Sequence, residues 1–149
     1  MSDEVAVVRR LFAAVEDRDL QSMLACYADD VEIHEAEVLP YGGTWRGREG
    51  AVAHAEGFLR AWGALQGPDE ISLDPQFWGD GAGRVCVLFR HRAVNSVTGA
   101  RFDAPEVSIY QVRDEHVVRS KMFHADSDAV VRFLHHAGHA RQNEPAAPS

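Results

Sequence analysis

Cysteine, basic charge and long apolar runs are what this sequence has least of. Its 149 residues hold two cysteines, Cys26 and Cys86, each alone in an apolar segment, which predicts small core side chains rather than a disulfide. The formal net charge is −8 and no basic stripe is present, which argues against binding to nucleic acid. Residues 1–10 lack the apolar core of a signal peptide, and no run approaches membrane-spanning length. We therefore expect a cytoplasmic protein that binds neither nucleic acid nor membrane.

Recognisable metal and cofactor motifs are also missing. There is no CxxC pair, no HExxH sequence and no glycine-rich loop that could cradle a phosphate, and the eight histidines are scattered. His135 and His139 could form a pair one helical turn apart, but a solvated helix face explains them better. The sequence therefore predicts no metal site and no cofactor.

Length and composition fit one globular domain. Hydrophobic residues make up 46% and charged residues 26% of a chain of 149 residues, which is enough to bury a real core. We predict a single domain over residues 1–140. Residues 141–149 contain Pro145 and Pro148 and predict a disordered tail.

The hydrophobic periodicity changes between the two halves of the chain. Helical stripes fall on residues 3–16, 20–27, 51–65 and 127–137. Extended patterns, separated by glycine-rich and other turn segments, fall on residues 70–78, 84–95, 101–113 and 116–125. Helices ahead of a run of strands predict an α+β domain. We expect a curved antiparallel or mixed sheet wrapped around the N-terminal helices, cone-shaped, with an internal pocket.

The most informative short segment is the strand predicted at residues 31–37. Val31 and Ile33 alternate with polar residues, so Glu35 is the next residue on the buried face. A carboxylate there is either paired or placed for chemistry, because an apolar pocket disfavours its charged form and suits a general base. His34 has the opposite parity and should face outward. A bulge before Pro40 could exchange the two faces, so both orientations stay open.

Further candidates share the faces of the other predicted strands. His124 is in phase with Ser120 and Met122, on a face that is concave if Val118 belongs to the core. It could act as an acid, a base or an orienting donor, or be a satisfied core histidine. Met122 would line the pocket beside it.

Two more strands and one turn supply the rest of the predicted site. His91 has the parity of core residues and could reach the pocket, although a hydrogen-bonded sheet histidine is the preferred interpretation. Ser108 and Tyr110 share a face and could offer polar contacts, with Glu106 as a second carboxylate. The remaining candidates are aromatic: Tyr41 and Trp45 bracket a glycine turn and could line the pocket or pack on the third helix.

The order of these elements resembles the nuclear transport factor 2-like superfamily. Three pieces carry the resemblance: the Tyr-Ala-Asp-Asp end of residues 20–30, the Gly-Arg-Glu helix entry at residues 47–49, and the strand pair 102–124 leading to Asp126. The similarity covers roughly residues 5–134. This superfamily includes ketosteroid isomerases, SnoaL-like polyketide cyclases and limonene epoxide hydrolase. The SnoaL-like and isomerase-like branch is the nearest match, although the fold alone does not fix an activity.

Carried across residue by residue, the resemblance puts Glu35 at the position of the isomerase's carboxylate base. The isomerase's oxyanion-binding tyrosine would fall on Leu11, and its second donor, an aspartate, near Ser108. Met122 would occupy the position of a catalytic aspartate of limonene epoxide hydrolase. The resemblance therefore implies this scaffold without the steroid isomerase's oxyanion hole and without the epoxide hydrolase's aspartate.

These observations predict an enzyme that needs no cofactor and acts on a small hydrophobic carbonyl compound. Glu35 would remove a proton next to the carbonyl, in a polyketide-type cyclisation or an isomerisation, and His124 would assist from the opposite wall with the substrate between them. The alternatives are a non-catalytic small-molecule-binding module, or a relative of dehydratases or epoxide hydrolases. We also expect a homodimer through the outer face of the sheet, where Leu88 and Val94 are apolar.

Overall fold

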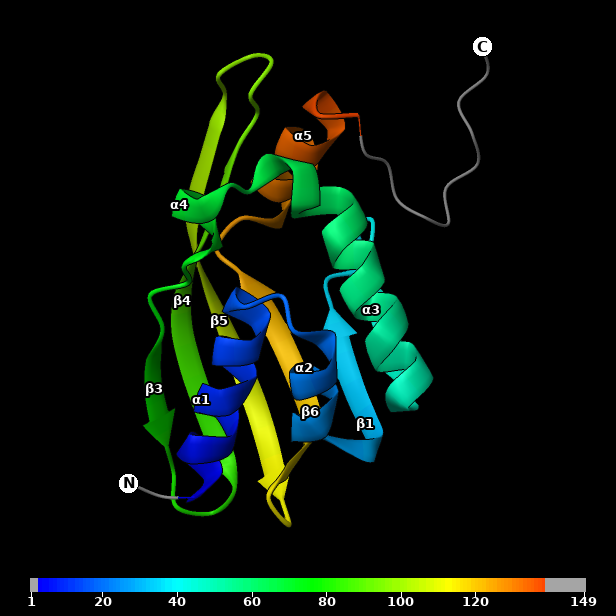
Figure 1. Cartoon of the computed structure of the whole chain (residues 1–149), viewed down its shortest axis with the longest axis vertical. Helices are drawn as coiled ribbons and strands as arrows, with labels where there is room; N and C mark the ends of the chain where they lie inside the picture. The colour runs from blue at the N-terminus through cyan, green and yellow to red at the C-terminus, as the bar shows by residue number, and fades with distance from the viewer. Residues whose placement is uncertain (1–2, 139–149) are drawn as a thin grey trace.

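Helices lie on one face of an open, six-stranded mixed sheet in the computed structural model, which describes residues 3–138 (Figure 1). The helices are α1 (Asp3–Glu16), α2 (Leu20–Cys26), α3 (Gly47–Trp62), the 3-10 turn η1 (Gly63–Leu65), α4 (Pro68–Ile71) and α5 (Ser127–His136). The strands are β1 (Tyr27–Glu35), β2 (Gly43–Arg46), β3 (Gln76–Gly79), β4 (Arg84–Val94), β5 (Arg101–Arg113) and β6 (His116–His124). Within residues 3–138, no helix has the length and apolarity needed to cross a membrane.

The predicted α+β cone is confirmed, and local sequence explains its helical half. Acidic Asp3 and Glu4 lie in the first turn of α1, where the helix dipole favours negative charge. The α2 helix begins after Asp19, whose carboxylate accepts a hydrogen bond from the Ser22 amide at 3.1 Å. Both helices pack on the same face of the sheet (Figure 1).

The strand order is β2-β1-β6-β5-β4-β3, and every neighbouring pair is antiparallel except β1 with β6. The parallel pair brings an early strand and the last strand side by side, with His34 opposite Lys121. The C-terminal ends of both strands therefore meet at one place. This is the position of Glu35 and His124.

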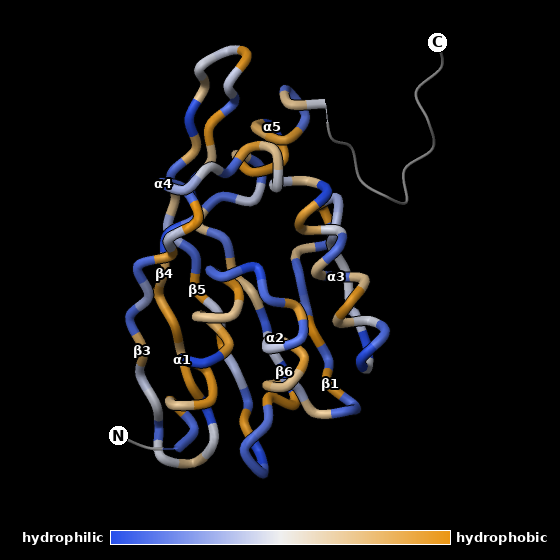
Figure 2. Tube along the Cα trace, in the orientation of Figure 1, coloured by the Kyte–Doolittle hydropathy of each residue, from blue (hydrophilic) through white to orange (hydrophobic). Residues whose placement is uncertain are grey.

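The core consists of two clusters. In the larger one, the Phe12 ring of α1 makes edge contacts with Phe77, Phe89 and Tyr110 at centroid distances of 5.5, 5.2 and 5.9 Å. The second cluster surrounds the buried Trp62 under α5. Figure 2 shows hydrophobic residues recurring along α1 and along the strands that it covers.

One prediction about local structure is wrong, and one condition stated in the sequence analysis is not met. Residues 70–78 are not one strand: Pro68 begins the short α4, Glu70 accepts a hydrogen bond from the Gly67 amide at 2.9 Å, and β3 starts at residue 76. In β6 the buried residue is Val117 rather than Val118, because the register with β5 shifts at this point by one residue. The predicted tail at residues 141–149 lies outside the described residues.

Candidate active site

An internal cavity of about 150 Å³ lies between the helices and the concave face of the sheet. Its wall is mostly apolar, with contributions from α1, α2, α3 and the sheet. The polar residues in the wall are Arg18, Tyr27, Glu35, His54, Glu56, His91, Glu106, Ser108 and Tyr110. The predicted pocket between sheet and helices is therefore present.

Glu35 faces inward and is held by two histidines. Its side chain is 4% exposed; Oε2 accepts a hydrogen bond from His54 Nε2 at 3.0 Å, and Oε1 accepts one from His124 Nε2 at 3.1 Å. The strand alternation predicted this orientation, since Val31 and Ile33 on the same face are fully buried. His34 points to the other face, where its Nδ1 lies 3.2 Å from Thr44 Oγ1. The choice left open by the sequence is thereby settled in favour of Glu35.

His54 is a candidate site residue that the sequence analysis missed. It lies on α3, three residues after Ala51 and directly before Ala55, so it belongs to the buried stripe of that helix. A histidine within the predicted buried stripe of a helix is a signal from which His54 could have been identified. Its role depends on Glu35, however, and that contact joins positions 19 residues apart.

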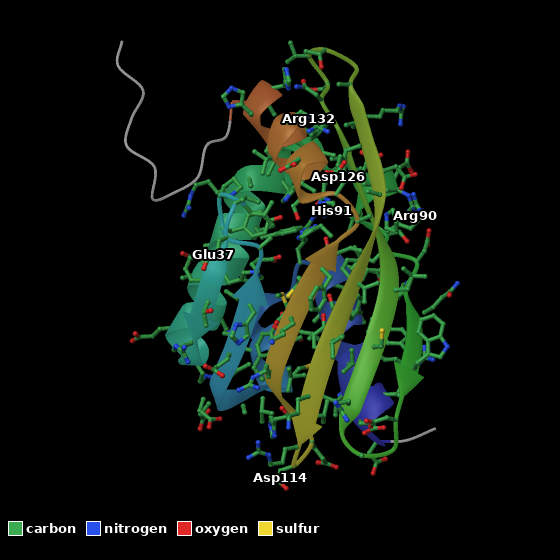
Figure 3. The ribbon with its side chains drawn as sticks, turned by 180° about the vertical axis from the view of Figure 1, so that it is seen from behind. Glu37, Arg90, His91, Asp114, Asp126 and Arg132 are labelled. Carbon is green, nitrogen blue, oxygen red and sulfur yellow. The ribbon has the colours of Figure 1, made fainter. Side chains whose placement is uncertain are left out.

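The contacts of Glu35 continue into a second carboxylate. His124 Nδ1 lies 3.0 Å from Glu106 Oε1, and His91 Nδ1 lies 3.5 Å from the same oxygen. Glu106 was only a minor candidate on sequence grounds. We call these five residues the His–Glu chain, in the order His54, Glu35, His124, Glu106, His91. Seen from behind, His91 lies inside the molecule below the segment that carries Asp126 (Figure 3).

The charge at the centre of the His–Glu chain is set by competing effects. Burial lowers the pKa of His124, but its hydrogen bonds to Glu106 and Glu35 outweigh burial and raise the pKa to about 10. Burial raises the pKa of Glu106, and its bonds to His124 and His91 outweigh this and lower the pKa to about 2. At neutral pH an imidazolium therefore lies between two buried carboxylates.

Hydroxyl groups on the sheet complete the polar wall. Burial raises the pKa of Tyr110 and of Tyr27 above the usual tyrosine value, so both remain protonated and can donate hydrogen bonds. Ser108 lies on the same face of β5 as Tyr110 and is fully buried. Among residues 3–138, no group of three or more histidine, cysteine or acidic side chains is arranged to hold a metal ion.

Five of the eight predicted site residues line the cavity: Glu35, His91, Ser108, Tyr110 and Met122. His124 does not, and the expected gap between it and Glu35 is absent. Because β1 and β6 are adjacent parallel strands, the two side chains touch, which leaves no space for a substrate between them. His124 therefore lies behind Glu35 rather than on an opposite wall.

Tyr41 and Trp45 are not among the residues that line the cavity, and they pack on α3, which is the other alternative that the sequence left open. Tyr41 is 1% exposed in the second core cluster, where its hydroxyl accepts a hydrogen bond from Trp62 Nε1 at 2.8 Å. Trp45 Nε1 donates to the Tyr41 carbonyl at 3.0 Å. Both rings lie near His54, at centroid distances of 5.9 and 6.2 Å. They pack behind His54 instead of contacting the cavity.

Comparison with solved structures places this architecture among the NTF2-like folds. An NTF2-like protein of unknown function from Burkholderia pseudomallei K96243 aligns with a TM-score of 0.76 and 24% identity, over 90% of this chain and 98% of that chain. TerC, co-crystallized with polyporic acid, aligns with a TM-score of 0.75 and 22% identity, over 90% and 99%. A proposed SnoaL-like polyketide cyclase from Jannaschia sp. CCS1 gives 0.70 and 18%, over 96% and 94%.

Sequence comparison is more specific than the fold. The SnoaL-like domain matches residues 8–120, so the chain belongs to the SnoaL-like domain family. No curated protein sequence matches it significantly. The family membership confirms the resemblance inferred from the three sequence pieces.

Proposed function

We propose that this protein is a cofactor-independent enzyme that moves protons on a small, largely apolar carbonyl compound. One observation carries the proposal: the Glu35 carboxylate and the His54 imidazole form a hydrogen-bonded pair in the wall of an otherwise mostly apolar cavity. Base chemistry next to a carbonyl needs a proton acceptor in a dry site together with hydrogen-bond donors for the oxygen. Cyclisation of a polyketide-type compound and isomerisation of an unsaturated ketone share this first step.

In the proposed reaction, the Glu35–His54 pair takes a proton from the carbon next to the carbonyl. The electrons of the broken C–H bond move to the carbonyl oxygen and form an enolate. A carboxylate only accepts hydrogen bonds, so His54 Nε2 carries the proton in its bond to Glu35, and His54 Nδ1 is left for the substrate. The proton is thus held at His54 Nδ1, and it is then returned either to another carbon of the enolate or, when the enolate carbon attacks a second carbonyl, to the oxygen of that carbonyl.

Other residues of the site have supporting roles in this proposal. The Tyr110 hydroxyl lies in the cavity wall and is the donor best suited to the enolate oxygen. It would replace the tyrosine donor missing at Leu11, and the Ser108 hydroxyl is a second, shorter donor in the same wall. His124 does not line the cavity and acts as a positioning residue, because it fixes the second oxygen of Glu35.

Exchange of solvent deuterium into a β,γ-unsaturated cyclic ketone, followed by NMR, tests proton abstraction without knowledge of the natural substrate. We expect Glu35→Gln to reduce the exchange rate by about a hundredfold or more, the scale of general-base loss. Glu32→Gln is the matched control, since Glu32 lies on the same strand but bonds to Arg46 and Arg119 on the outer face. A thermal melt of each variant separates loss of activity from loss of folding. Unchanged exchange in Glu35→Gln would refute the assignment.

A second function is favoured by the saturation of Glu35. Both of its oxygens already accept hydrogen bonds, which is also what a non-catalytic cavity for a hydrophobic ligand would require. TerC, which shares the fold, was co-crystallized with polyporic acid. Ligand binding by the wild-type protein with no deuterium exchange, and with little effect of Glu35→Gln, would favour this binding-only function.

We also propose that the protein forms a homodimer through the outer face of the sheet. Leu88, Val107 and Phe123 lie side by side across β4, β5 and β6, and Leu88 and Phe123 are 36% and 51% exposed. An apolar stripe on a sheet face is a common contact between identical subunits. Sedimentation that shows only monomer at micromolar concentration would contradict the dimer.

A further inference from the structure

Arg18 differs from every other residue of the cavity wall. Among the described residues that line the cavity, it is the one arginine or lysine. It lies two residues after the end of α1, with a φ of 56°, the left-handed conformation that a non-glycine residue rarely adopts. This turn bends the chain at the end of α1, and the side chain belongs to the wall of the cavity beside Leu20.

The guanidinium group of Arg18 is held in place by neutral partners. Its Nη2 donates a hydrogen bond to the Gln66 side-chain oxygen. The Gln66 amide nitrogen in turn donates to the Arg92 carbonyl of β4 at 2.8 Å, so the glutamine is itself anchored. The Arg18 guanidinium also lies over the Phe58 ring, 5.7 Å from its centroid. The group is therefore positioned without being neutralised.

No carboxylate of residues 3–138 forms an ion pair with Arg18, and this separates it from Arg92 of β4 and Arg119 of β6. Arg92 pairs with Asp74 at 2.6 Å, and Arg119 pairs with Glu32 at 3.0 Å. Burial lowers the pKa of Arg18 from the usual arginine value, although the group remains charged at neutral pH. A half-buried cation without a counter-ion has lost hydration that no protein carboxylate replaces.

Two residues of the cavity wall differ in their access to water. Arg18 is half-buried, whereas the Glu35 side chain is 4% exposed. The guanidinium is therefore within reach of water, and the Glu35 carboxylate is not. A ligand that reaches Glu35 with its apolar part would leave its other end near the guanidinium.

We propose that Arg18 binds a carboxylate group of the ligand, so that the substrate is a small cyclic carbonyl compound with a carboxylate at its opposite end. The identification of the ligand as a substrate rests on the proposed function, whereas the anion site itself does not. Arginine suits this task because its planar donors match both oxygens of a carboxylate. The alternative is purely structural: Arg18 would only tie the end of α1 to Gln66.

Binding of benzoate and of its neutral analogue methyl benzoate tests the anion site. A cavity of about 150 Å³ is of the size that accepts a single aromatic ring. Ligand-observed NMR titrations give the two dissociation constants for wild type, Arg18→Gln and Arg18→Lys. Arg9→Gln is the matched control, because the Arg9 guanidinium of α1 also lies over a ring, 4.5 Å from the Phe77 centroid, but Arg9 is not part of the wall.

We expect Arg18→Gln to weaken benzoate binding by about tenfold or more and to leave methyl benzoate binding unchanged. Arg18→Lys should recover part of the loss, and Arg9→Gln should behave as wild type. The inference is wrong if wild type does not bind benzoate, or if Arg18→Gln binds it equally well. It is also wrong if both ligands weaken together with a lower melting temperature, which is the structural outcome.

The same titrations in a Glu35→Gln background keep this inference separate from the proposed function. Carboxylate selectivity that depends on Arg18, together with no deuterium exchange by the wild-type protein, would support the anion site and refute the enzyme. Deuterium exchange that depends on Glu35, without carboxylate selectivity, would support the enzyme and refute the anion site.

Discussion

Glu32 and Glu35 lie three positions apart on β1, and each carboxylate is held by two nitrogen-bearing side chains. Glu32 faces outward and binds Arg46 of β2 and Arg119 of β6. Glu35 faces inward and binds two histidines, one from α3 and one from β6. The two glutamates therefore share a strand and a similar number of partners, but their surroundings differ. The Glu32 side chain is 22% exposed, and the Glu35 side chain is 4% exposed.

The difference shows why similar contacts have different consequences. At the outer face, water and salt screen the charges, so each ion pair contributes little to stability. In the interior, a charge without its partner is expensive, because nothing replaces the lost hydration. Arginine therefore serves outside as a permanent cation. Inside, His124 is a cation at neutral pH because its hydrogen bonds to two carboxylates raise its pKa.

The largest expected effect comes from removing the cation between the two buried carboxylates. His124→Ala should lower the free energy of unfolding by about 3–5 kcal/mol, because Glu35 and Glu106 then face each other without a shared donor. Arg119→Ala is the matched change on the same strand. It should cost about 1 kcal/mol or less, since Glu32 keeps Arg46. Urea unfolding at neutral pH measures both.

A volume effect can be separated from the charge effect in that comparison. His124→Phe fills the space of the imidazole but donates no hydrogen bond, so it should be destabilising by a similar amount. If His124→Phe restores wild-type stability, or if the His124 and Arg119 variants lose equal amounts, the buried charge is not what matters.

The pH dependence of the free energy of unfolding should also come from the buried residues around Glu35. The folded pKa of His124, about 10, exceeds the ordinary value of 6.5, so its contribution is complete below about pH 6.5 and is lost as the pH rises toward 10. The free energy of unfolding should therefore fall by up to about 1.4 kcal/mol per pH unit in that window. Urea unfolding between about pH 7 and 9 measures the slope.

Glu106 should produce the opposite slope in acid. Its folded pKa of about 2 lies below the ordinary value of 4.5, so its contribution is present above about pH 4.5 and is lost as the pH falls toward 2.

The control for the alkaline slope is a variant without the titrating histidine: His124→Phe should flatten that slope. An unchanged alkaline slope in that variant would mean that His124 is not the titrating group.

Strand alternation favoured the inward orientation of Glu35, with a bulge as the open alternative, and it also suggested His91, Ser108 and Tyr110. These predictions hold because side-chain direction in a strand depends only on parity and on one buried face. The bulge in β6 was not predictable in this way. It exchanges the parity of Val117 and Val118, and it requires knowledge of the pairing with β5.

Contacts between distant segments account for the rest of what the sequence did not reveal. Glu35 contacts His124, which is 89 positions away in the sequence, and Arg18 contacts Gln66, which is 48 positions away. Neither contact can be predicted from the hydrophobic periodicity of the sequence. The sequence left the position of Tyr41 open for a related reason. An aromatic residue beside a glycine turn can point to a cavity or to the core, and the hydrogen bond from Trp62 Nε1 holds Tyr41 in the core.

The smallest expected effect lies on the outer face, and its salt dependence completes the comparison. Glu32→Gln keeps the shape of the side chain but removes the charge that faces Arg46 and Arg119. We expect a loss of about 1 kcal/mol or less at low ionic strength. At about 1 M salt the screening length falls to roughly 3 Å, so this loss should vanish. The loss caused by His124→Ala should persist, because salt does not reach a side chain that is 4% exposed. Urea unfolding of both variants at low and high potassium chloride measures the difference, and a salt-insensitive loss in Glu32→Gln would mean that the two faces of β1 are electrostatically alike.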